Sequence, residues 1–170
     1  YALNRSKRPD WMFVRQSYGG PGIDILIHDY DLARWITGLD WKNIVMKEYR
    51  SGQVADEDFS DSAEMGSRDD GKSLALKMFW NSPRGRWDRF AVFGTKGFLE
   101  KSFCDGKVLY VNENGVADYL PLVSASESFA ARFFDALLNG TSDFPVSGKE
   151  SLLITERLLN ARNSSTGQLK

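Results

Sequence analysis

One histidine and one aspartate form the clearest pair of groups in this sequence that could move a proton. His28 is the only histidine among the 170 residues, and it stands four residues after Asp24. On a helix, that spacing places a carboxylate and an imidazole about one turn apart on the same surface. Histidine exchanges protons near neutral pH, and a neighbouring aspartate can hold its ring. The pair predicts a general acid–base site, although the spacing by itself is more typical of a surface or capping arrangement.

Two other chemistries have weaker support in the sequence. A metal site could be drawn from Asp24, His28 and Asp31, but zinc favours more histidine and cysteine ligands than the chain has, so we predict no metal. The single cysteine, Cys104, has no second histidine or basic motif beside it that would activate a thiol. We therefore expect Cys104 to be structural.

A glycine-rich turn, Gly19-Gly20-Pro21-Gly22, precedes the pair. It begins like the G-x-G-x-x-G dinucleotide fingerprint, but Ile25 stands where the third glycine is needed, and no valine- or isoleucine-rich strand leads into the turn. We therefore predict no nucleotide-binding site in this chain. Because the turn carries no bulky side chain, we expect a ligand to be able to approach the start of the following helix.

The element that would position the pair is a helix expected over residues 24–37. Gly38 stands where a left-handed C-cap glycine commonly ends a helix. On a helical wheel the apolar residues gather into one arc, with the pair along its edge. The arc consists of Ile25, Leu26, Leu32, Ala33 and Ile36. Further upstream, residues 11–14 predict a short strand or an extended arm.

The middle of the chain is typical of strands joined by hairpins. Asp69-Asp70-Gly71 is a hairpin turn signal between two alternating or apolar runs. The expected strands cover residues 42–50, 62–67, 73–81, 89–93, 97–103 and 107–111. Short turns between consecutive strands imply antiparallel pairing.

Two helices are expected near the end of the chain, over residues 126–139 and 147–163. Ser147 and Glu150 are spaced as a capping box at the start of the second helix. The apolar residues of the first helix share one side: Phe129, Phe133, Phe134, Leu137 and Leu138. Those of the second form its expected buried stripe: Leu152, Leu153, Leu158 and Leu159. The sequence thus predicts an α+β fold, with helices on one face of a largely antiparallel open sheet and the other face solvated or covered by a partner.

Composition narrows the classes of partner. With 22 basic and 23 acidic residues the net charge is −1, which gives no electrostatic footprint for nucleic acid or an anionic membrane. No apolar run approaches the roughly 18–20 residues of a membrane span, and no signal peptide is evident. One cysteine suggests a reducing compartment or indifference to redox. We expect a cytoplasmic protein and, from its length, a single domain over residues 1–170.

Three stretches resemble one known family. The segment from Gly19 to Gly38, GGPGIDILIHDYDLARWITG, is similar to the helix-opening motif in the C-terminal domain of the GFO/IDH/MocA family, the glucose–fructose oxidoreductase, inositol dehydrogenase and rhizopine-catabolism proteins. The segments from Ser82 to Glu100 and from Phe129 to Ser165 resemble the family's strand–turn–strand and its last two helices. The three occur in family order and span nearly the whole chain from Gly19 onward.

The resemblance implies roles for particular residues. His28 would give or take the proton of the substrate hydroxyl, and Asp24 would orient the substrate or tune the histidine. Trp87 falls where several polyol-oxidising members place a tyrosine near the substrate, and is our third substrate-site residue. Because indole cannot reproduce the hydrogen bonding of a phenol, a cyclic polyol substrate is less strongly indicated.

The resemblance also implies an incomplete enzyme. NAD or NADP would be bound mainly by an N-terminal Rossmann domain that this chain lacks, together with the family's catalytic lysine, so the fragment alone should be inactive. Substrates would be sugars, inositol-like polyols or related hydroxy compounds, and the open sheet face would join a homodimer or homotetramer. The alternative is a non-catalytic assembly or binding module of the same fold.

Overall fold

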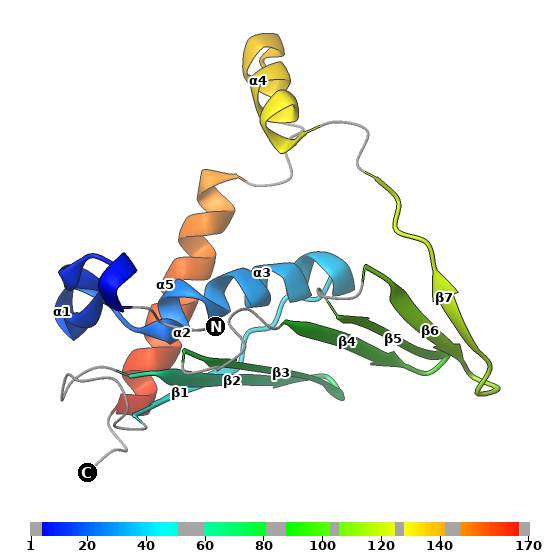
Figure 1. The fold of residues 1–170 in the computed structure, drawn as a ribbon, viewed down its shortest axis with the longest axis horizontal. Coiled ribbons are helices and arrows are strands. Elements are labelled where there is room, and N and C mark those ends of the chain that lie inside the picture. The colour runs from blue at the N-terminus through cyan, green and yellow to red at the C-terminus, as the bar shows by residue number, and fades with distance from the viewer. Residues whose placement is uncertain are drawn as a thin grey trace. The chain divides into compact units, whose positions relative to one another are not determined.

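The computed structural model describes residues 5–50, 60–80, 88–102, 106–124, 128–141 and 147–166, so Trp87 and Cys104 lie outside the described residues. Contacts divide the chain into two compact units, residues 1–85 with 146–170, and residues 86–145 (Figure 1). Among the described residues, no helix combines the length and apolar character needed to cross a bilayer. The expected single substrate-binding and oligomerisation domain over residues 1–170 stays a prediction.

The first unit is built on a three-stranded antiparallel sheet in the order β1-β2-β3. Its strands are β1 (Ile44–Tyr49), β2 (Ser62–Asp69) and β3 (Lys72–Phe79). In the turn between β2 and β3, Asp70 and Gly71 have φ values of 47° and 73°. A two-residue type I′ hairpin requires positive φ at both of these positions. The hairpin predicted at Asp69-Asp70-Gly71 is therefore confirmed.

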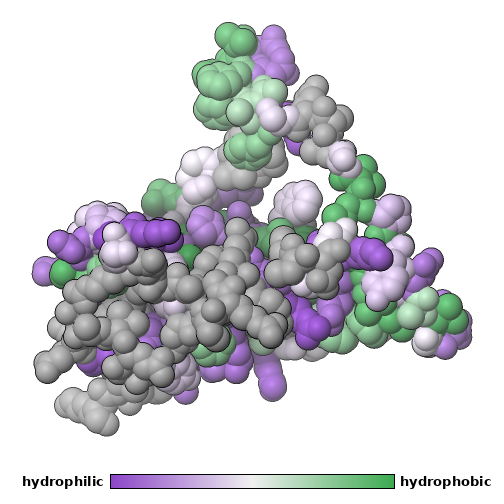
Figure 2. All heavy atoms as spheres, in the orientation of Figure 1, coloured by the Kyte–Doolittle hydropathy of each residue, from purple (hydrophilic) through white to green (hydrophobic). Residues whose placement is uncertain are grey.

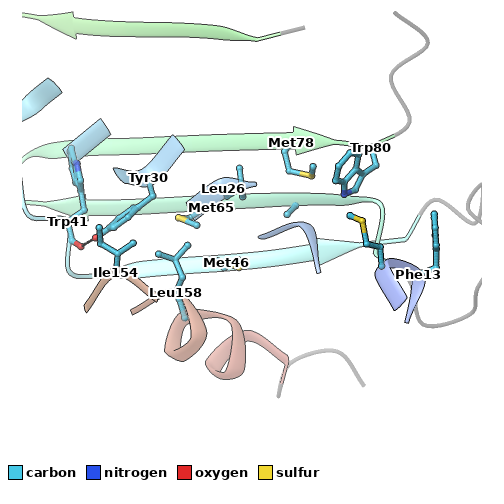
Figure 3. Packing of buried hydrophobic residues seen from close by; sticks show 13 residues of the cluster. Phe13, Leu26, Tyr30, Trp41, Met46, Met65, Met78, Trp80, Ile154 and Leu158 are labelled. Atoms are coloured by element: carbon cyan, nitrogen blue, oxygen red, sulfur yellow. Dashed lines mark hydrogen bonds between the residues drawn. The ribbon is translucent and has the colours of Figure 1, made fainter. Parts of the chain in front are cut away.

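One face of this sheet is covered by α2 (Pro21–Asp24), α3 (Leu26–Thr37) and α5 (Gly148–Thr166), with α3 packed on β3 and α5 on β1. Side chains on that face alternate with exposed ones, as a half-covered strand requires. Figure 3 shows the resulting core between the sheet and the helices. It consists of Met12, Phe13, Leu26, Tyr30, Trp41, Met46, Ala63, Met65, Met78, Trp80, Ile154, Leu158 and Ala161.

The buried stripe of α3 differs in part from the predicted arc. Leu26, Tyr30 and Ala33 are buried at i, i+4 and i+7, whereas Ile36 is 42% exposed. Tyr30 enters the core because its hydroxyl donates a hydrogen bond to the Trp41 carbonyl, which satisfies the polar end of a buried aromatic ring (Figure 3). The predicted helix end is confirmed, since Gly38 caps α3 in the left-handed conformation.

The buried face of the last helix also differs in part from the predicted stripe, of which Leu158 is buried. Its buried residues are Ile154, Leu158 and Ala161, while the predicted Leu152 and Leu153 are exposed. The capping box is confirmed, because the Ser147 hydroxyl accepts from the Glu150 amide at 3.1 Å. The expected strand or arm at residues 11–14 is wrong: Asp10–Phe13 forms a 3-10 helix that buries Met12 and Phe13.

The second unit holds a four-stranded antiparallel sheet in the order β4-β5-β6-β7. Its strands are β4 (Arg89–Gly94), β5 (Gly97–Ser102), β6 (Val108–Asn112) and β7 (Ala117–Leu120). Helix α4 (Phe129–Asn139) begins at Ser128, whose hydroxyl accepts from the Ala131 amide. The apolar side of α4 is exposed, as its green surface in Figure 2 shows. The α+β class is confirmed. The described strands form two sheets, and strand β7 was not predicted from the sequence.

Candidate functional site

The glycine-rich turn that precedes the predicted pair is packed against the sheet. A side chain on Gly22 would begin 2.5 Å from the Met46 sulfur and 2.9 Å from Glu48 Oε1. Gly20 is similarly enclosed and has a φ of 98°, which only glycine adopts readily. On the side that faces β1, the expected room for a ligand is therefore occupied by the side chains of Met46 and Glu48.

Glu48 fixes this turn to β1. The Gly22 amide donates to Glu48 Oε1 at 3.0 Å, and the Arg15 guanidinium forms an ion pair with the same carboxylate. Arg15 also donates to the Ser60 hydroxyl at 3.1 Å. The Glu48 side chain is only 6% exposed, so its charge is buried together with these partners. Glu48 thereby determines where the segment after the turn, which carries Asp24, lies on the sheet.

Asp24 ends α2 and is held by a residue that the sequence analysis missed. The Tyr18 hydroxyl donates a hydrogen bond to Asp24 Oδ2 at 2.8 Å. Tyr18 closes α1 (Arg15–Tyr18), and the chain reverses through Gly19 and Gly20, which brings the two side chains together. A contact between residues six apart fits neither a helix, where i+6 lies on another face, nor a strand, where i+6 lies about 20 Å away. The only available signal was a tyrosine directly before two glycines.

His28 lies in the first turn of α3, and its side chain is exposed. Between it and Asp24 the helix is interrupted at Ile25, whose carbonyl accepts from the His28 amide at 3.0 Å. The imidazole makes no hydrogen bond or ion pair with any residue that the structure describes. The two predicted residues thus occupy adjacent turns, but the hydrogen bond on the Asp24 carboxylate comes from Tyr18 and not from His28. The proposed acid–base role remains a prediction.

The wider surroundings give no metal centre. Asp31 is paired with Arg34 on the same helix, at 3.6 Å. Across the described ranges, no three histidine, cysteine or carboxylate side chains are grouped so that they could hold a metal ion. The trio of Asp24, His28 and Asp31 is accordingly not assembled as a ligand set.

Burial and the aspartate together act on Tyr18. Burial raises the pKa of the Tyr18 phenol well above its ordinary value of 10.0, and the hydrogen bond to the negative Asp24 raises it further. Two neighbours lower the pKa of Tyr18 by smaller amounts: the Trp80 side chain in the core and the positive charge of Arg8. Arg8 lies 5.9 Å from the centre of the Trp80 ring. Tyr18 therefore keeps its proton and remains a hydrogen-bond donor throughout the neutral range.

This raised pKa predicts a loss of stability in alkali. The unfolded chain releases the Tyr18 proton near pH 10 and the folded protein only at higher pH, so the contribution is complete below about pH 10 and falls above it. The fall is at most about 1.4 kcal/mol per pH unit. Urea unfolding at about pH 9 and about pH 11 should show a smaller alkaline loss for Tyr18→Phe than for wild type. Tyr119→Phe, which removes an exposed phenol, is the control; equal losses for Tyr18→Phe and wild type would contradict the expectation.

Comparison with known proteins identifies a family and several solved structures of similar fold. The family model described as GFO/IDH/MocA C-terminal domain matches residues 1–100. A Thermotoga maritima protein provisionally named an oxidoreductase matches with a TM-score of 0.83 and 28% identity, over 99% of this chain and 51% of its own. No curated protein matches the sequence.

Two further structures share the fold at low identity. Levoglucosan dehydrogenase in complex with NADH and L-sorbose matches with a TM-score of 0.69 and 16% identity, over 95% of this chain and 54% of its own. UDP-N-acetylglucosamine 3-dehydrogenase from Acidithiobacillus ferrooxidans matches with a TM-score of 0.73 and 17% identity, over 92% of this chain and 51% of its own. The chain therefore spans about half the length of the structures it matches.

Proposed function

The chain belongs to the GFO/IDH/MocA family as a C-terminal domain, and from that premise we propose that it is the substrate-side domain of an NAD(P)-dependent oxidoreductase. The observation that carries the proposal is the exposed imidazole of His28, one turn after an Asp24 carboxylate that Tyr18 already holds. The proposed substrate is a sugar, a polyol or a related hydroxy compound. Such compounds present several hydroxyl groups that a carboxylate and an imidazole can bind.

The proposed chemistry is oxidation of a hydroxyl to a carbonyl, or its reverse. In the oxidative direction the carbon loses a hydride and the oxygen loses a proton. His28 takes that proton in its neutral form and returns it when the reaction runs backwards. Asp24 accepts a hydrogen bond from a substrate hydroxyl and so orients the substrate for the transfer. Both roles require side chains that can reach a ligand, which the exposure of His28 supports.

The hydride acceptor is a nicotinamide cofactor held outside the residues described here. NADH is bound in one structure with the same fold, which supports this choice. The only glycine-rich turn that begins like a dinucleotide fingerprint is closed by Met46 and Glu48, so this chain's contribution is to the substrate. L-sorbose in the same relative supports a carbohydrate as the ligand.

Self-association through the outer face of the first sheet completes the proposal. On that face the strands carry exposed apolar residues, among them Val45 and Phe79, between charged ones such as the paired Glu64 and Lys77. A mixed surface of this kind is typical of an interface with a polar rim. We propose a homodimer or homotetramer formed by this face, which light scattering on the purified full-length protein would test.

The enzymatic proposal is tested by turnover. Full-length protein is incubated with D-glucose, myo-inositol, levoglucosan or L-sorbose, each with oxidised or reduced NAD and NADP, and nicotinamide absorbance is followed. We expect turnover of at least one compound, and a lower kcat for Asp24→Asn, since the amide replaces one acceptor oxygen with a donor. Lys72→Ala, in an exposed position at the start of β3, is the control. Absence of turnover with every compound and cofactor would contradict the proposed substrate class.

A further inference from the structure

We propose that Tyr18 is a positioning residue, whose phenol holds the Asp24 carboxylate so that its second oxygen is presented to a substrate hydroxyl. This inference rests on the proposed function and adds to it a residue from a different helix. The observation behind it is the hydrogen bond of 2.8 Å from the Tyr18 hydroxyl to Asp24 Oδ2.

The hydrogen bond leaves half of the carboxylate available. Asp24 Oδ2 is taken by Tyr18, while Oδ1 makes no hydrogen bond or ion pair with the residues that the structure describes. A carboxylate held at one oxygen loses most of its freedom to rotate, so its other oxygen keeps a fixed direction. An acceptor that is oriented before the substrate arrives avoids the entropy cost of being ordered on binding.

Tyr18 is itself firmly placed, which a positioning residue must be. Its ring packs against the edge of the core, and the chain on either side is fixed by α1 and by the turn that Glu48 holds. Arg162 of α5 donates to the Gly19 carbonyl, which ties the residue after Tyr18 to the last helix. Because burial and Asp24 raise the pKa of the phenol, it keeps its proton and donates this hydrogen bond throughout the neutral range.

A double-mutant cycle separates positioning from a merely structural role. Turnover is measured in full-length protein with the compound of the panel that wild type converts fastest, for wild type, Tyr18→Phe, Asp24→Ala and the double variant. Tyr18→Phe keeps the ring and removes only the hydroxyl. If Tyr18 acts through Asp24, its loss should lower kcat by about 10- to 100-fold in wild type. In the Asp24→Ala background the same change should alter kcat by less than about threefold.

Each outcome of the cycle decides the inference. Equal losses of kcat in both backgrounds would mean that the hydroxyl acts independently of Asp24, and would overturn it. So would full kcat in Tyr18→Phe while His28→Ala remains slow. If His28→Ala retains full turnover, or if wild type converts no compound of the panel, the proposed function fails and the inference fails with it. Thermal unfolding of each variant shows whether a loss of activity reflects loss of the fold.

Discussion

Replacing His28 with alanine in the full-length enzyme is expected to lower kcat by about 10²- to 10⁴-fold, the range found for general acid–base residues. The proton moves in the transition state, so kcat and kcat/KM should fall together while KM changes little. The side chain is exposed and has no partner among the described residues, so its loss should leave the fold intact. Steady-state kinetics with the panel compounds measure the effect.

A matched control lies on the same helix. Ile36→Ala removes an exposed side chain two turns further along α3 and should retain wild-type turnover. His28→Gln tests the chemistry more narrowly, because the amide can form hydrogen bonds but cannot exchange a proton near neutral pH. Full activity in His28→Ala would show that proton transfer belongs to another group.

The largest expected effect on stability comes from Glu48→Ala. The substitution leaves the Gly22 amide without its acceptor and the Arg15 guanidinium without its carboxylate. Removing one partner of a buried charged hydrogen bond costs about 3 kcal/mol of unfolding free energy. Urea denaturation should show this loss, with a smaller loss for Glu48→Gln, whose amide oxygen can still accept from Gly22.

The same sheet supplies the control for Glu48. Glu64 lies on the outer face of β2, where its carboxylate pairs with Lys77 at 2.7 Å in an exposed setting. Exposed ion pairs contribute little because water screens both charges, so Glu64→Ala should cost only a small part of the Glu48 effect. Equal losses for the two variants would contradict the buried role of Glu48. A fall in kcat for Glu48→Ala would further link this anchor to the position of Asp24.

Local signals predicted the elements that short-range chemistry decides. The turn at Asp70 and Gly71 follows from backbone conformations that few residues adopt, and the capping box at Ser147 and Glu150 from a hydrogen bond within one helical turn. The end of α3 at Gly38 was predicted in the same way. In each case the stabilising contact lies within a few residues.

Features that depend on surroundings beyond the local sequence pattern were predicted less well. Tyr30 is buried in place of Ile36 because Trp41, on the loop before β1, offers its carbonyl to the phenol. The residues after Pro9 formed a 3-10 helix and not a strand, since a short apolar run fits either element. Strand β7 was not predicted, because its residues are all exposed and show no alternation of buried and exposed positions.

The candidate site also has features that the sequence predicted and features that only the fold produces. The spacing of Asp24 and His28 was visible in the sequence, and the family motif around them gave the spacing a meaning. Tyr18 was not visible as a partner of Asp24, because only the reversal of the chain at Gly19 and Gly20 brings the two together. The closure of that turn by Met46 and Glu48 depends on β1, more than twenty residues away in sequence.

The proposed function requires that this domain present His28 to the reacting oxygen of a hydroxylated substrate. A crystal structure of the full-length protein with NADH and L-sorbose tests it most directly. We predict a sugar oxygen within hydrogen-bond distance of a His28 ring nitrogen, about 2.6–3.2 Å, with a neighbouring hydroxyl on Asp24. A sugar bound beside the nicotinamide but away from both His28 and Asp24 would contradict the claim.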